Sequence, residues 1–464
     1  MTSVLGERYA SPAMREIWSR EYKVIKEREL WVQVLRSQKK LGLDVSESVI
    51  KSYEGKIEFI DLESIDERER KTQHDVMARI QEFNSLAGRQ EIHIGMTSRD
   101  LTENIEISLV KKSLELVLFK CDALLLRIAN FAHQYKEMVM VGRTHNVPAQ
   151  VTTLGRRFCV WLEELFFARQ HLVEFIDRLP IRGIKGALGT TQDLNLLFPG
   201  RTTEINEDLK ILFGIENELI APSQIYPRSI DLELVTLLSQ LSASPSNLAF
   251  NVRLMAGQSL LNEGFSKDQV GSSAMPHKIN PRLSERVNSL SAVIKGHVTM
   301  IQELSGTQWN EGDVSCSVVR RVALPDAFFA LDAVLDTTMR IVDGLVIDEK
   351  RISAEVDENI PFLLSSSILM CAVKNGAGRE EAHTTIKELA NRARTQGIDI
   401  RENFFASVLQ EKSLRITEED LALMLSKDGL ASGPIAQVNR LTGKILEKIG
   451  NSEALRVYFP EKLI

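Results

Sequence analysis

The sequence predicts an all-α protein, and three observations support this fold class. Apolar residues recur with the period of an amphipathic helix along most of the chain. One segment carries an unbroken heptad seam of apolar residues. Strand-like apolar runs are short and confined to residues 138–141 and 181–184. We therefore expect three helical domains, with a central bundle of long helices that assembles into a multi-subunit helical core.

The heptad seam predicts the longest helix of the bundle, over residues 100–135. Such a helix would be about 50 Å long at 1.5 Å per residue. Further apolar residues flank the seam, so we expect this helix to be buried on several sides and inside an oligomer, because one chain could hardly cover it alone. The seam positions are spaced alternately by three and four residues: Ile107, Val110, Leu114, Val117, Cys121, Leu124, Ile128 and Phe131.

Similar periodicity predicts four more bundle helices, over residues 154–179, 231–262, 282–304 and 325–342. Pro245 falls inside the second of these and should kink it, because proline removes a backbone N–H donor and clashes with the preceding turn. The pattern divides the chain into an N-terminal helical domain (1–99), a central bundle (100–348) and a C-terminal helical domain (349–464).

Composition and charge exclude several classes of function. The 464 residues carry 57 Lys plus Arg and 63 Asp plus Glu, and the net charge of −6 argues against nucleic acid as a partner. The first residues lack the apolar core of a signal peptide, and charged residues interrupt the best apolar run, 114–129. The four scattered cysteines and the histidine spacing suggest neither disulfides nor a metal site. We expect a cytoplasmic protein that binds no membrane.

Residues 271–281, Gly-Ser-Ser-Ala-Met-Pro-His-Lys-Ile-Asn-Pro, concentrate side chains that can perform chemistry. Glycine and proline bracket the segment and disfavour a helix, so we expect a shaped loop. A base close to a cation suits removal of a proton from carbon next to a carboxylate, because the anion that forms needs charge stabilisation. On these residues alone, an ordinary surface turn is an equally good interpretation.

Further polar segments lie at the expected ends of helices, where functional groups tend to be found on a rigid bundle. Hydroxyl and backbone N–H groups before the long helix can bind an anion such as phosphate, although an N-cap by Ser98 or Asp100 is the alternative. Single histidines are more often structural, and the adjacent Arg320 and Arg321 would usually be solvated. The segments are 71–78, 93–100, 142–150 and 308–315.

Taken together, these segments resemble the fumarase/aspartase superfamily and, within it, the adenylosuccinate lyase family. The 271–281 segment is similar to the characteristic loop of the superfamily. The resemblance extends from residue 8 to beyond residue 380. The family itself is identified from Arg8-Tyr9-Ala10-Ser11-Pro12, His74-Asp75, Thr97-Ser98, Gly142-Arg143-Thr144-His145 and Gly378-Arg379-Glu380-Glu381-Ala382-His383.

The resemblance implies a cofactor-free C–N lyase that catalyses β-elimination. Adenylosuccinate would give AMP plus fumarate, and the succinylated imidazole-carboxamide ribotide of purine synthesis (SAICAR) would give its carboxamide (AICAR) plus fumarate. The resemblance also implies a homotetramer in which each active site takes residues from three subunits and binds an anionic nucleotide.

The same resemblance implies the catalytic residues. Ser272 would be the general base, once its environment lowers the pKa of its hydroxyl. Lys278 and Asn280 would stabilise the doubly charged aci-carboxylate that forms. His145 would protonate the departing purine nitrogen, with Glu285 orienting its ring.

The remaining implied residues contact the substrate. His74, which the resemblance also implies as a catalytic residue, would lie close to the substrate phosphate or to His145. Two departures from the family stand out: Gln73 replaces a common arginine, and Gly312 stands where many members carry one. We expect Arg320 to replace that second arginine, or the succinyl or phosphate end to be held differently. The implied contacts are Arg8, Tyr9, Gln73, Asp75, His93, Thr97, Ser98, Gln224, Arg286, Ser317 and Arg321.

Two alternatives belong to other classes. One is another lyase of the superfamily, such as an argininosuccinate lyase or a carboxy-muconate cycloisomerase, against which the Arg8-Tyr9 and His74-Asp75 segments argue. The other is a non-catalytic helical scaffold. A scaffold would not need Ser272, His145, Lys278 and Asn280 all together.

Overall fold

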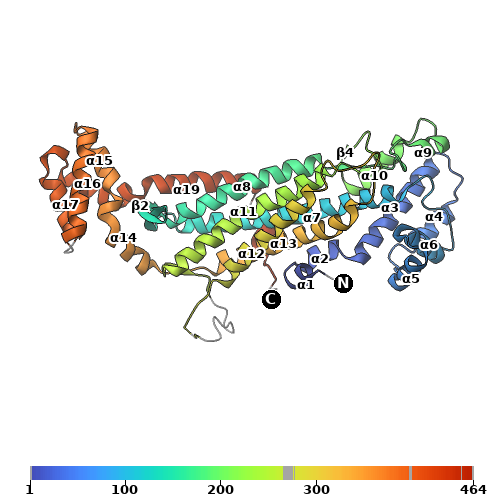
Figure 1. The fold of residues 1–464 in the computed structure, drawn as a ribbon, viewed down its shortest axis with the longest axis horizontal. Coiled ribbons are helices and arrows are strands. Elements are labelled where there is room, and N and C mark those ends of the chain that lie inside the picture. The colour runs from blue at the N-terminus through green and yellow to red at the C-terminus, as the bar shows by residue number, and fades with distance from the viewer. Residues whose placement is uncertain (1–2, 265–274, 276, 397–399, 451, 462–464) are drawn as a thin grey trace.

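The computed structural model describes residues 3–264, 275, 277–396, 400–450 and 452–461. It confirms the all-α fold class. Figure 1 shows an elongated molecule in which long helices run side by side, with the short N-terminal helices at one end and a group of C-terminal helices at the other. Two apolar cores match this arrangement, since one extends from the N-terminal helices through the bundle and the other lies within the C-terminal helices.

Serine residues start the first helices. The hydroxyls of Ser3, Ser11 and Ser19 each accept a backbone N–H from the first turn of the helix that follows, which satisfies one unpaired donor. A buried ion pair of 2.5 Å between Arg28 and Glu82 then joins the third helix to the sixth. The helices are α1 (Val4–Arg8), α2 (Pro12–Ile17), α3 (Arg20–Lys40), α4 (Glu47–Glu54), α5 (Leu62–Thr72) and α6 (Asp75–Ala87).

Five long helices form the central bundle, as the periodicity predicts. Pro245 lies inside one of them and Pro325 inside another, so neither proline ends its helix. The expected start at residue 325 is wrong, because the last helix begins nine residues earlier, at Cys316. The bundle helices are α7 (Ser98–Gln134), α8 (Leu154–Arg178), α11 (Ser229–Gly257), α12 (Arg282–Gln302) and α13 (Cys316–Gly344).

The heptad seam of α7 is buried within a single chain. Its eight side chains are between 0 and 8% exposed. The helix packs against α3, α8, α13 and α19 (Lys427–Ile449), a late helix that returns along the bundle. The expectation that one chain could hardly cover this helix is therefore wrong, and the seam is not evidence for an oligomer.

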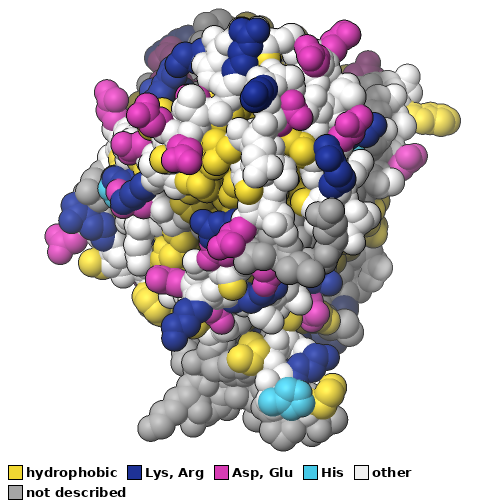
Figure 2. All heavy atoms as spheres, turned by 90° about the vertical axis from the view of Figure 1, so that its left-hand side faces the viewer, with side chains coloured by type: hydrophobic (Ala, Val, Ile, Leu, Met, Phe, Trp, Pro, Cys, Tyr) yellow, Lys and Arg dark blue, Asp and Glu magenta, His cyan; other side chains and the backbone are white. Residues whose placement is uncertain are grey.

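The C-terminal helices form their own core beside a β-hairpin. The predicted boundaries at residues 99 and 348 stay predictions. One stretch, Glu349–Lys374, is long and apolar enough to cross a membrane by length and composition, but Ile360, Leu363 and Ile368 within it are core residues, and a core helix passes the same test. Figure 2 views this end of the molecule and shows Lys and Arg interspersed with Asp and Glu. The helices are α14 (Glu349–Leu363), α15 (Ser365–Lys374), α16 (Arg379–Gln396), α17 (Ile400–Gln410) and α18 (Glu418–Leu425). The last helix, α20 (Glu453–Val457), packs against α7 and belongs to the core of the bundle.

Short strand pairs connect the helices. β1 (Val139–Thr144) pairs antiparallel with β2 (Val147–Thr153), and the predicted strand at residues 138–141 lies in this hairpin. β2 was not predicted, because Pro148 and the polar residues after it give no apolar run. The other elements are α9 (Gln192–Leu197), α10 (Thr203–Phe213), the parallel pair β3 (Pro180–Ile181) and β4 (Asn217–Glu218), and the antiparallel pair β5 (Leu261–Asn262) and β6 (Val346–Ile347).

Asp100 fixes the start of α7. It is fully buried, pairs with Arg182, and accepts backbone N–H groups from Thr97 and Lys185, both at 2.8 Å. Asp100→Asn would leave the Arg182 guanidinium buried without its counter-charge, so we expect the free energy of unfolding to fall by about 3–5 kcal/mol. Urea unfolding measures this. Glu115→Gln, on the exposed side of the same helix, should change it by less than about 1 kcal/mol.

Candidate functional site

The first group of predicted site residues lies where the N-terminal ends of α6, α7 and α13 meet. His74 caps α6, and its Nε2 lies 3.5 Å from the hydroxyl of Ser98 in the first turn of α7. Arg321 of α13 donates to Asp75 at 3.1 Å. Residues that are more than 200 positions apart in sequence are thus brought together, beside helix ends whose free N–H groups favour anions.

The contacts of His74 leave one ring nitrogen available. Its Nδ1 accepts the backbone N–H of Met77 at 3.2 Å, so in the neutral ring the proton lies on Nε2, which faces Ser98. The side chain is 50% exposed. Burial raises the pKa of the neighbouring Asp75 carboxyl, but the charge of Arg79, the backbone N–H of Val76 and the charge of Arg321 together outweigh it and hold that pKa below its usual value. His74 can therefore donate to a ligand beside a fixed carboxylate.

His93 is held by a tryptophan. Trp31 Nε1 donates to His93 Nδ1 at 3.0 Å, and burial lowers the pKa of His93 to about 4. His93 is therefore neutral at physiological pH. Thr97 is the N-cap of α7, and Asp100 accepts its backbone N–H. The interpretation of Ser98 or Asp100 as the N-cap is wrong, and the Ser98 hydroxyl faces His74 instead.

The low pKa of His93 makes stability depend on pH. Between its unfolded value of 6.5 and about 4, the unfolded chain binds a proton that the folded chain does not, so stability falls as the pH falls. From pH 7 to pH 5 we expect wild type to lose about 2 kcal/mol more than His93→Gln. Chemical unfolding at both pH values measures the difference. The exposed His133→Gln should behave as wild type; a shared slope in all three proteins would contradict the prediction.

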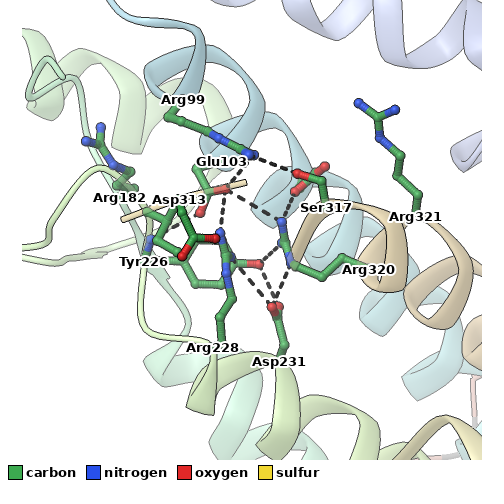
Figure 3. Close-up of polar contacts among 12 residues, drawn as sticks. Arg99, Glu103, Arg182, Tyr226, Arg228, Asp231, Asp313, Ser317, Arg320 and Arg321 are labelled. Carbon is green, nitrogen blue, oxygen red and sulfur yellow. Dashed lines mark hydrogen bonds and ion pairs between the residues drawn. The ribbon is translucent and has the colours of Figure 1, made fainter. Parts of the chain in front are cut away.

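Figure 3 shows a buried ion-pair network around Glu103, which Arg99 joins to Ser317 at the start of α13. Arg320 is 3% exposed and contacts Glu106 at 2.6 Å and Asp231 at 2.7 Å. The expectation that Arg320 replaces a cation at Gly312 is therefore wrong, because its guanidinium is committed to these carboxylates. Gly312 itself has a φ of +133°, which disfavours any side chain there. The exposed arginine of the pair is Arg321, which is 65% exposed.

Gln73 precedes His74 of the first group, and Gln224 lies near the ion-pair network. Gln73, in the left-handed conformation that ends α5, is exposed, and its side chain donates to the carbonyl of Arg70 at 2.8 Å. Gln224 lies on a loop that reaches α7, since Tyr226 two residues later donates its backbone N–H to Glu103 at 3.1 Å. Gln224 also donates its own N–H to the carbonyl of Glu311.

The second group surrounds Tyr9. The guanidinium carbons of Arg8 and Arg286 lie 5.9 and 5.6 Å from the centroid of its ring. Arg286 is in the first turns of α12, next to the exposed Glu285, and residues 277–281 lead into this helix. Lys278 is exposed and Asn280 is partly exposed. The predicted base, Ser272, lies outside the described residues.

The third group is the β1–β2 hairpin that carries His145. His145 and the residue after it have positive φ values, 52° and 62°, and form the turn, where the histidine is exposed. Arg143 of the hairpin pairs with Glu355 of α14, which fixes the turn to the C-terminal helices. Among the described residues, no hydrogen bond or ion pair joins His145 to Glu285.

The first and third groups lie at opposite ends of the bundle. Ser98, at the start of α7, faces His74, and the His145 hairpin follows the end of the same helix. The 37 residues of α7 span about 55 Å at 1.5 Å per residue. Figure 1 shows α6 and β2 at the two ends. One chain does not bring His74 and His145 into a common site.

Sequence reasoning missed Arg99 and Glu103. The guanidinium of Arg99 donates a hydrogen bond to the Ser317 hydroxyl at 2.9 Å. The carboxylate of Glu103 forms ion pairs with three arginines, Arg99, Arg228 and Arg320. The predicted contact Ser317 is thus joined to the start of α7 by a residue next to the predicted Thr97-Ser98 pair. The position of Arg99 directly after Thr97-Ser98 was the sequence feature that could have indicated it. Within the described part of the chain, no group of three or more His, Cys, Asp or Glu side chains could hold a metal ion.

Comparisons with known proteins identify relatives of this chain. A family model described as lyase matches residues 8–296. The adenylosuccinate lyase of Saccharomyces cerevisiae is 32% identical over 400 residues, which cover 84% of this chain and 83% of that protein. The adenylosuccinate lyase of Caenorhabditis briggsae is 33% identical over 422 residues, 88% of each. The 3-carboxy-cis,cis-muconate lactonizing enzyme of Pseudomonas putida has the same fold, with a TM-score of 0.82 at 19% identity over 97% of this chain and 100% of that one.

Proposed function

The chain belongs to the adenylosuccinate lyases of the fumarase/aspartase superfamily, and on that premise we propose that it releases fumarate from adenylosuccinate by β-elimination, giving AMP. We extend the proposal to SAICAR, which has the same succinyl–nitrogen bond and would give AICAR. The enzyme is a lyase. Its proposed setting is the cytoplasm, and the reaction needs no cofactor, because a base, an acid and a charge stabiliser suffice for β-elimination.

The observation that carries the proposal is the first group of residues. It combines an exposed arginine, Arg321, with the hydroxyls of Ser98 and Ser317 and the N–H groups at the starts of α7 and α13. Such a set suits the anionic end of a nucleotide, since guanidinium, hydroxyl and helix N-terminus all donate to phosphate or carboxylate oxygen.

The catalytic steps follow the roles predicted from sequence. Ser272 removes the proton from the succinyl carbon, and Lys278 and Asn280 stabilise the aci-carboxylate. His145 then protonates the departing nitrogen as the C–N bond breaks, with Glu285 orienting its ring. Each step moves one proton: the first leaves the aci-carboxylate, and the second breaks the C–N bond and leaves fumarate and a neutral amine. His74, whose Nε2 lies 3.5 Å from the Ser98 hydroxyl, holds the substrate.

Two observations support a homotetramer with shared active sites. Because α7 separates His74 from His145 by about 55 Å, a site that uses both needs a second copy of the chain. Four bundle helices also present pairs of exposed apolar side chains at helical spacing, which another copy would cover. The pairs are Val160 and Phe167, Phe250 and Leu254, Val293 and Met300, and Val318 and Val322.

The deciding experiment is an ultraviolet assay of the purified full-length protein. Adenylosuccinate and SAICAR should each release fumarate, and argininosuccinate should not. Release from argininosuccinate alone would identify another lyase of the superfamily. No release from any of the three substrates would contradict the proposed activity.

A further inference from the structure

Arg99 lies in the first turn of α7, and its guanidinium reaches the first turn of α13 (Figure 3). Nη2 donates to Ser317 Oγ at 2.9 Å, and Nη1 lies 3.4 Å from Glu103 Oε1. The side chain is 13% exposed, so the guanidinium lies at the edge of the buried network, towards the first group of site residues. The Arg99 guanidinium and the Ser317 hydroxyl are close enough to donate hydrogen bonds to the same oxyanion group.

Glu103 fixes the orientation of Arg99. Its carboxylate is fully buried, and it also accepts Arg228 Nη2 at 2.8 Å and the backbone N–H of Tyr226 at 3.1 Å. With the carboxylate held in this way, one nitrogen of Arg99 is anchored and the other faces Ser317. A guanidinium that is already ordered loses little freedom when it binds an anion.

Ser317, which Arg99 contacts, lies on the same helix as Arg321. The serine and Arg321 are four residues apart on α13, so they lie on the same face of that helix. Arg321 is 65% exposed and pairs with Asp75, whereas Arg320 and Arg228 are each at most 4% exposed and bind carboxylates of the network. Arg99 is therefore the arginine of the network that combines an exposed edge with a contact to Ser317.

We propose that Arg99 is a substrate-binding residue that donates, together with Ser317, to one anionic group of the nucleotide substrate. The shared chemistry is an oxyanion, either the phosphate or a succinyl carboxylate. This inference rests on the proposed function for the identity of the substrate. The competing role for Arg99 is structural, as an i,i+4 partner of Glu103 that stabilises the start of α7.

The test compares Arg99→Gln, Arg99→Lys and wild type. Because a hydrogen bond from a charged group is lost, Arg99→Gln should raise KM for adenylosuccinate about 10- to 100-fold while kcat changes less than about threefold. Arg99→Lys keeps the positive charge but lacks the planar set of N–H donors of a guanidinium, so its KM should lie between those of wild type and Arg99→Gln. Arg201→Gln removes the same charge from an exposed ion pair and should match wild type.

Product inhibition identifies the oxyanion. If Arg99 binds the phosphate, Arg99→Gln raises the inhibition constant of AMP and leaves that of fumarate unchanged; if it binds a carboxylate, the reverse holds. Unchanged KM and inhibition constants, with a lowered melting temperature, would assign Arg99 the structural role and overturn the inference. A wild-type protein that binds AMP in calorimetry but releases no fumarate would contradict the proposed function instead, and the affinity of Arg99→Gln for AMP would still test this residue.

Discussion

Ser272→Ala should lower kcat for fumarate release by about 10²- to 10⁴-fold, the usual contribution of a general base. The proton leaves carbon next to a carboxylate, and removing the only base assigned to it leaves water to do this work. KM should change much less, because the substrate contacts proposed for Ser98, Ser317 and Arg321 remain. The absorbance assay measures both constants.

The neighbouring serine provides the control. Ser273→Ala removes an identical hydroxyl one residue away and should keep kcat within about threefold of wild type, as expected for a residue outside the chemistry. If Ser273→Ala were the inactive variant, the base would be reassigned. If both variants kept full activity, the proposed mechanism would be wrong, although the lyase activity itself would stand.

Two inactive variants at opposite ends of the chain should restore activity when mixed. His74→Gln damages the site at the start of α7, and His145→Gln damages the site beyond its end. In a mixed closed oligomer, random assembly gives about a quarter of the composite sites both native histidines, so about a quarter of wild-type activity should return. The expectation follows from the length of α7, because no chain uses its own two histidines in one site.

The mixing experiment needs proof that subunits exchange. The two variants are refolded or expressed together with different tags, and mixed oligomers are isolated through both tags before the assay. Mixed oligomers without recovered activity would contradict the shared site. Sedimentation of wild type as an active monomer would contradict it independently.

The sequence predicts the local features of this protein well. The expected helix over 100–135 matches α7, Ser98–Gln134, because its seam continues without interruption. The N-cap was misplaced by one residue, since Thr97 and Ser98 have similar side chains and only the backbone geometry separates them. Similarly, the first turns of α13, before Pro325, were not predicted, because proline usually marks the boundary of a helix and here lies inside one.

Contacts between distant segments were beyond prediction. The ion pairs of Arg320 with Glu106 and Asp231 join three helices that are far apart in sequence, and no local sequence pattern predicts these contacts. The burial of the α7 seam has the same origin, because α19, which begins about 300 residues later in the sequence, covers part of it. The contact of His74 with Ser98, which places this histidine at the start of α7, likewise joins segments that no local pattern relates.

The length of α7 also makes activity a measure of assembly. If the two ends of this helix serve different active sites, a free subunit holds only fractions of sites, however well it is folded. Specific activity should then fall as the enzyme is diluted below the concentration at which its subunits associate, while its helical content stays the same. The helix that gives each chain its rigidity would therefore make catalysis a property of the assembly and of its concentration.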